Sequence, residues 1–149
     1  MLARRDVIKG LGMGLTTLPL ATVLANPALV RAAADTVQQV ESTLPNGKKV
    51  TAALAMPATL PAPAVVLIHE WWGLNDQIKA VAADFAAQGY IALAIDLMDG
   101  KVATTPDEAK AQTAAVGADA QTAIDTCTLW TDWLRSHKDS TGKVGTCGW

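Results

Sequence analysis

The sequence predicts one α/β domain, a three-layer sandwich in which helices cover both faces of a mostly parallel sheet. Segments typical of strands and of helices alternate through residues 36–149, which favours right-handed crossovers between parallel strands. The segment 64–68 is apolar without alternation, as a strand buried on both faces requires. A chain of 149 residues, 50% hydrophobic and with a net charge of −2, suits one globular domain.

The first predicted elements are an antiparallel hairpin and a buried strand. Residues 36–42 and 49–55 form the hairpin, because Pro45-Asn46-Gly47 between them is a turn signal. The buried strand at 64–68 follows. A helix should then begin at the N-cap Asn75 and stop near Gly89.

The second half predicts a strand over 90–95, a long helical region and a short last strand over 144–147. The helical region begins at Thr105, which starts a capping box, and bends near Gly117. Its second part is expected to bury one stripe, formed by Ala120, Ile124, Cys127, Trp130 and Leu134. Ligands of such sheets bind at the carboxyl ends of the strands.

Residues 1–34 are predicted to be an export signal peptide of the twin-arginine type. Arg4 and Arg5 precede a mildly apolar stretch, and the small residues 32–34 suggest cleavage before Asp35. Residues 35–149 are then the domain, with the export machinery as a partner and a periplasmic or secreted location. The alternative is an ordinary amphipathic helix.

Several classes of partner are not expected. The chain has no basic stripe for nucleic acid and, after residue 34, no apolar run long enough to span a membrane. Cys127 and Cys147 lack metal-ligand spacing, and a disulfide between them is left open. No metal or organic cofactor is predicted, since the glycines at 10–14 do not complete a dinucleotide loop.

Three segments resemble the dienelactone hydrolase family, the carboxymethylenebutenolidase-like α/β-hydrolases. These are Val65-Val66-Leu67-Ile68-His69-Glu70-Trp71-Trp72-Gly73-Leu74-Asn75, Ile91-Ala92-Leu93-Ala94-Ile95-Asp96-Leu97 and Lys143-Val144-Gly145-Thr146-Cys147-Gly148-Trp149. The resemblance covers nearly all of residues 36–149. It implies an α/β-hydrolase fold that is truncated after the fifth strand.

The resemblance also implies a nucleophile that the chain does not contain. Gly148 and Trp149 match the first two positions of the Gly-x-nucleophile-x-Gly elbow, so the nucleophile, cysteine or serine, would be residue 150. The acid and the histidine of the triad would follow later. Cys147 is an alternative nucleophile, but Trp149 stands where the elbow needs its last glycine. A small, buried strand residue is the favoured interpretation of Cys147.

The family resemblance assigns the other wall of the site. Glu70 would lie beside the nucleophile and help to generate a thiolate, and the backbone N–H of Trp71 would be one oxyanion donor. Trp72 would line a flat, apolar substrate pocket. Members that act on dienelactone often carry an arginine after the next strand, where this chain offers Lys101 for a substrate carboxylate.

These assignments predict a hydrolase that acts on a small ester or lactone through an acyl-enzyme, and a 149-residue chain that is inactive. His69 is expected to be a hydrogen-bonded core histidine, and Asp96 to cap a loop rather than to serve as the triad acid. Two other functions are considered: a non-catalytic exported remnant and a small ligand-binding module.

Overall fold

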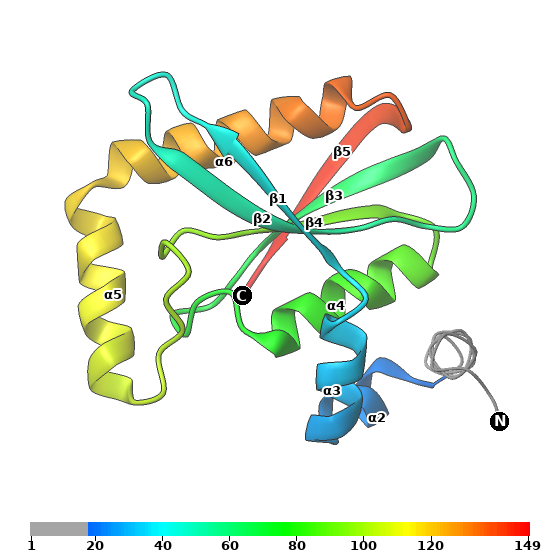
Figure 1. Ribbon diagram of the computed structural model, residues 1–149, viewed down its shortest axis with the longest axis horizontal. Coiled ribbons are helices and arrows are strands. Elements are labelled where there is room, and N and C mark those ends of the chain that lie inside the picture. Colours follow the sequence, from blue (N-terminus) through cyan, green and yellow to red (C-terminus); the bar gives the residue numbers. More distant parts are fainter. Residues whose placement is uncertain (1–17) are drawn as a thin grey trace, which may run out of the picture.

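The computed structural model describes residues 18–149 as one five-stranded sheet with helices on both faces (Figure 1). The strands are β1 (Gln38–Thr43), β2 (Lys49–Ala55), β3 (Ala62–Ile68), β4 (Ile91–Ile95) and β5 (Ser140–Gly148). The helices are α2 (Leu20–Leu24), α3 (Pro27–Ala34), α4 (Asp76–Ala87), α5 (Pro106–Ala118) and α6 (Ala120–Ser136). This element order confirms the predicted alternation of strands and helices.

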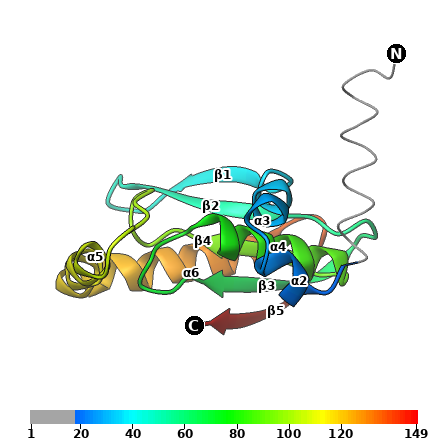
Figure 2. The same ribbon diagram turned by 90° about the horizontal axis from the view of Figure 1, so that it is seen from below.

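The sheet is mixed, with the strand order β1-β2-β4-β3-β5. β3 pairs in parallel with both β4 and β5, whereas β2 is antiparallel to β1 and to β4. Figure 2 shows the strands stacked in this order, with β3 and β5 pointing the same way. The antiparallel hairpin therefore lies at one edge, as predicted, and β5 lies at the other.

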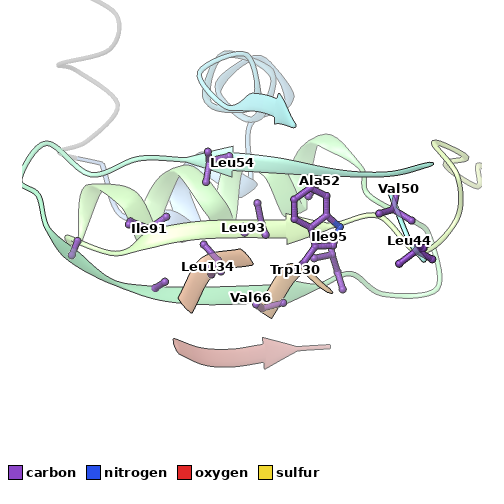
Figure 3. Packing of buried hydrophobic residues seen from close by; sticks show 12 residues of the cluster. Leu44, Val50, Ala52, Leu54, Val66, Ile91, Leu93, Ile95, Trp130 and Leu134 are labelled. Atoms are coloured by element: carbon purple, nitrogen blue, oxygen red, sulfur yellow. The ribbon is translucent and has the colours of Figure 1, made fainter. Parts of the chain in front are cut away.

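Two hydrophobic clusters hold the three layers together. On one face α6 inserts Trp130 and Leu134, both fully buried, against side chains that include Val66 and Leu93 (Figure 3). On the other face α4 packs Val81 and other side chains onto the sheet. Figure 1 shows α6 and α4 on opposite sides of the sheet. The strand β4 between them is buried along its whole length, and β3, which was predicted from its unbroken apolar run, is largely buried as well.

The helix starts follow the local sequence signals. The Asn75 side chain accepts a hydrogen bond from the Ile78 N–H at 3.1 Å and caps α4. Thr105 and Glu108 form the predicted capping box of α5: the Glu108 N–H donates to Thr105 Oγ1 and the Thr105 N–H donates to Glu108 Oε2, both at 3.3 Å. Hydrogen bonds from the Thr104 backbone and side chain lower the pKa of the Glu108 carboxyl.

The predicted stripe of the second long helix was partly wrong. Trp130 and Leu134 are buried and Cys127 is partly buried, but Ala120 is exposed and 57% of Ile124 is exposed. The buried face of α6 contains Thr126, Trp130 and Leu134, whereas Ile124, six residues before Trp130, lies about 120° around the helix from it. The break between the helices falls at Asp119 rather than at Gly117.

The twin-arginine pair, the apolar residues up to 17 and the glycines at 10–14 lie outside the described residues. The predicted cleavage site lies at the end of α3, where Ala33 packs with Val30 and with Ala80 of α4. Arg31 joins the two helices through an ion pair with Asp76 at 3.3 Å. The boundary at residue 35 stays a prediction. Of the helices within residues 18–149, none has the length and hydrophobicity that a bilayer crossing needs.

Candidate active site

The carboxyl ends of the neighbouring parallel strands β3 and β5 lie side by side. Their parallel register pairs Ile68 with Gly148, so the residues that follow, His69 and Trp149, stand side by side. The backbones approach closely here, since a Cβ added to Gly148 would lie 3.5 Å from the Ile68 Cβ. Glu70 follows His69 and is the second residue after the end of β3.

A tight turn follows β3 and carries the family's candidate residues. The Gly73 N–H donates to the Glu70 carbonyl oxygen at 3.1 Å, which places Trp71 and Trp72 at the two central positions of the turn. Gly73 has a φ of 91°. A Cβ at this position would collide with the Lys101 carbonyl oxygen, so glycine is required both by conformation and by space.

The turn leaves Glu70 and Trp71 exposed just beyond the carboxyl end of β3. The Glu70 side chain is exposed and forms no hydrogen bond with another described residue. The Trp71 ring, 39% exposed, contacts the Trp72 ring edge to face, with 5.0 Å between ring centroids. Within residues 18–149 the Trp71 backbone N–H has no acceptor, so it is available to a ligand.

His69 is a hydrogen-bonded core histidine, which confirms the sequence prediction. The residue is 6% exposed. Its Nδ1 lies 2.7 Å from the Glu70 carbonyl oxygen, and its Nε2 lies 3.1 Å from the Leu97 backbone nitrogen. Both ring nitrogens are occupied by backbone groups, so neither is free to act as a catalytic base.

Asp96 caps the loop after β4, again as predicted. Its carboxylate accepts hydrogen bonds from the backbone N–H of Met98, at 2.8 Å, and of Gly100. The Thr51 hydroxyl donates to the same carboxylate at 3.3 Å. A carboxylate that satisfies three donors in a buried position holds the loop in place.

Lys101 lies on this same loop but faces a different region from Trp72. The Ala103 N–H donates to the Trp72 carbonyl oxygen at 2.9 Å, which joins the two loops through their backbones. Lys101 lines a cavity between its loop and helices α5 and α6, together with Asp96 and Asp99. Trp72 is not among the described residues that line this cavity. The two candidate substrate-binding residues, Trp72 and Lys101, therefore lie on connected loops but do not line the same cavity.

The two cysteines are free thiols on opposite faces of the sheet. Cys127 packs into the cluster under α6, and burial raises the pKa of its thiol. Cys147 lies beside Leu67 within β5 and packs on the α4 side. The sheet separates them, which answers the open question of pairing for the described fold.

We therefore expect two free thiols and no bond between them. Titration of the unfolded protein with a thiol reagent, without a reductant, should find both residues, because a disulfide requires Cα atoms within about 7 Å of each other. A peptide map that shows a disulfide between Cys127 and Cys147 would contradict the placement of α6 and β5.

Substitution of Gly73 tests the turn itself. We expect Gly73→Ala to lower the free energy of unfolding by about 2–4 kcal/mol, because the new Cβ adds a backbone collision to an unfavourable φ. The control is Gly47→Ala, since Gly47 has a similar φ of 86° and no atom within 4 Å of the added Cβ. Equal losses in the two variants, measured by urea denaturation, would show that the contact with Lys101 is unimportant.

Sequence reasoning missed the bonds that hold this edge together. The Leu97 N–H donates to His69 Nε2, and the Ala103 N–H donates to the Trp72 carbonyl oxygen. These two bonds join the turn after β3 to the loop after β4. A glycine after a strand, such as Gly73, is the one local signal of a turn that this region offers. Within the described part of the chain, no three His, Cys, Asp or Glu side chains come together as a candidate metal site.

The arrangement of sheet, helices and paired strand tips is that of the α/β-hydrolase fold. The structure named m3DLH aligns with a TM-score of 0.63 and 22% identity, covering 76% of this chain and 50% of that one. A dienelactone hydrolase-like promiscuous phosphotriesterase, P91, from metagenomic libraries aligns with a TM-score of 0.63 and 21% identity, covering 76% and 49%. These likenesses establish the fold class.

The particular family follows from the sequence. The model of the dienelactone hydrolase family matches residues 50–149, more than half of the chain, and the chain belongs to that family. "Protein usf" of Aquifex pyrophilus is 43% identical over 67 residues, 43% of this chain and 29% of the relative. A "Putative carboxymethylenebutenolidase" of Aquifex aeolicus is 40% identical over the same shares. The match thus spans less than a third of these relatives.

Proposed function

We propose that the complete protein hydrolyses an ester or lactone through an acyl-enzyme, and that this chain supplies one wall of its active site. The register of β3 with β5 carries the proposal. It pairs Ile68 with Gly148, so a residue that follows Trp149 would lie close to Glu70 and to the turn of Trp71. In an acyl transferase the attacking atom and the oxyanion donors must surround the same carbonyl carbon.

Each residue then has a distinct role in this proposal. The residue after Trp149, a cysteine or serine, attacks the carbonyl carbon, and the Trp71 N–H binds the oxygen that becomes negative. A second donor would be the N–H of the residue after the nucleophile. Glu70, exposed and without a partner among the described residues, would lie beside the nucleophile, pair with the nucleophile and its histidine, and help to generate the thiolate.

The two tryptophans support a flat, apolar substrate. Their edge-to-face rings form an aromatic surface directly beside the proposed oxyanion donor. One relative is named as a carboxymethylenebutenolidase, which agrees with a lactone as substrate. Lys101 would reach a substrate carboxylate only if the substrate extends toward the loop after β4, because Lys101 lines the cavity on that side.

We also propose that the protein is exported through the twin-arginine route to the periplasm or beyond. Arg4 and Arg5, followed by a mildly apolar stretch and Ala32–Ala34, support this. Replacing both arginines with lysine should keep the product in the cytoplasm. Unchanged secretion of that variant would contradict the route.

The hydrolase proposal is tested by hydrolysis of p-nitrophenyl acetate. We expect the full-length gene product to be active and residues 1–149 alone to be inactive. In the full-length protein, Glu70→Gln should lower kcat about 10²-fold, the order of an acid–base contribution. Cys147→Ala should leave kcat unchanged, because the Cys147 side chain packs against the hydrophobic cluster on the α4 face of the sheet. Turnover by residues 1–149 that survives Cys147→Ala but disappears with Glu70→Gln would refute the assigned nucleophile.

A further inference from the structure

The carbonyl group of Glu70 is held by two donors. His69 Nδ1 lies 2.7 Å from the Glu70 oxygen, and the Gly73 nitrogen lies 3.1 Å from it. A carbonyl oxygen can only accept, so His69 Nδ1 must carry the ring proton. The two bonds approach one oxygen from the core and from the far end of the turn, and together they fix the plane of the peptide between Glu70 and Trp71.

Fixing this peptide also aims the Trp71 N–H. In a trans peptide the C=O and the following N–H lie in one plane and point in opposite directions. The Glu70 oxygen faces the buried imidazole, so the Trp71 N–H faces away from it. Among residues 18–149 no acceptor is bonded to this N–H. A rotation of the peptide would turn the donor and its carbonyl together.

The loop after β4 determines the protonation of the other ring nitrogen of His69. The Leu97 N–H, directly after Asp96, donates to His69 Nε2 at 3.1 Å. Nε2 must therefore be unprotonated, and the two contacts select one neutral tautomer of a ring that is 6% exposed. The end of β4 thereby holds the imidazole, and the imidazole holds the peptide after β3.

We propose that His69 is a positioning residue that orients the Trp71 N–H toward the oxyanion, without touching the substrate. This inference rests on the proposed acyl-transfer function. Its physical basis is that a preorganised donor must already point to where negative charge develops. A misplaced donor loses transition-state stabilisation, and displacements of about 1 Å can cost about 10²-fold in rate.

Two isosteric substitutions in the full-length protein separate positioning from packing. His69→Asn places an amide N–H near the position of Nδ1 and retains a donor to the Glu70 oxygen. His69→Gln places its amide near Nε2, where it can accept from Leu97 but leaves Glu70 without the buried donor. We expect His69→Gln to lower kcat for p-nitrophenyl acetate about 10-fold or more with KM unchanged, and His69→Asn to retain most of kcat.

A double variant tests whether His69 acts through Trp71. Trp71→Pro removes the N–H, so adding His69→Gln to Trp71→Pro should lower kcat no further, which is the signature of one shared interaction. If both His69 variants are equally slow, or if the two losses multiply, the positioning role is refuted while the hydrolase function stands. A wild-type protein without esterase activity would instead refute the function on which the inference rests.

The tautomer gives an independent measurement that requires no catalytic variant. The sequence has two histidines, so a His137→Gln protein leaves His69 as the single imidazole in a nitrogen-15 NMR spectrum. We expect the proton on Nδ1 and a bare Nε2. A proton on Nε2, or rapid exchange between the two nitrogens, would show that the ring does not hold the Glu70 carbonyl and would overturn the inference.

Discussion

Replacing Trp71 with proline in the full-length protein should lower kcat for p-nitrophenyl acetate about 10²- to 10³-fold, with little change in KM. Proline has no backbone N–H, and the loss of one oxyanion donor typically has an effect of this order. Trp71 occupies the second position of the turn closed by Gly73 and Glu70, a position where proline is favoured. The variant should therefore keep the turn and lose the donor.

The matched control is Trp71→Phe, which keeps the N–H and an aromatic ring. We expect this variant to change KM more than kcat, because the ring contacts Trp72 and the proposed substrate rather than the developing charge. Steady-state kinetics over a range of ester concentrations separates the two parameters. A proline variant as active as the phenylalanine variant would exclude the Trp71 N–H as an oxyanion donor.

Trp130→Ala should give the largest loss of stability, about 3–5 kcal/mol in the free energy of unfolding. Trp130 is fully buried, and Figure 3 shows its ring beside Ile95 and Ala52 in the layer between α6 and the sheet. Removing the indole leaves a cavity that the neighbouring strands cannot close without leaving the sheet. Urea denaturation measures the loss as a change in midpoint at constant slope.

Ile124→Ala on the same helix is the control for this prediction. Ile124 is 57% exposed, so its truncation removes little buried area and should change stability by less than about 1 kcal/mol. The sequence alone placed both residues on one buried stripe. Similar losses for Ile124→Ala and Trp130→Ala would mean that Ile124 is buried to the same extent as Trp130, contrary to the structure.

Local chemistry made much of the fold predictable. The β2 segment Lys49–Ala55, the Asn75 cap and the capping box at Thr105 were all expected from short patterns, and the structure confirms them. Such features depend on neighbours within a few residues. The last strand was expected over 144–147 and is longer, because the polar residues from Ser140 onward pair with the start of β3, which no local pattern announces.

The stripe of α6 shows a different limit. Apolar residues at mixed spacings of three and four residues drift around a helix, so they do not all face the sheet. Ile124 lies about 120° around α6 from Trp130 and is exposed, whereas Thr126, Trp130 and Leu134 share the buried face. Thr126 was not expected in the core and is 2% exposed, with its hydroxyl bonded to the Thr122 carbonyl oxygen at 2.7 Å.

The candidate site was predictable as a set of residues but not as a geometry. Family resemblance pointed to Glu70 and Trp71, and spacing placed both after a buried strand. The bond from the Leu97 N–H to His69 joins segments 28 positions apart and exists because β3 and β4 are parallel neighbours. Neither that contact nor the orientation of the Trp71 N–H that follows from it could be predicted without the three-dimensional structure.

The most direct measurement of the central claim is the location of the acyl group in the working enzyme. The full-length protein would be mixed with p-nitrophenyl acetate, quenched in acid during turnover, digested and mapped by mass spectrometry. We predict that the acetyl group is on the residue immediately after Trp149, close to Glu70 at the carboxyl ends of β3 and β5. An acetyl group on Cys147, or on any residue distant from this edge of the sheet, would contradict the account.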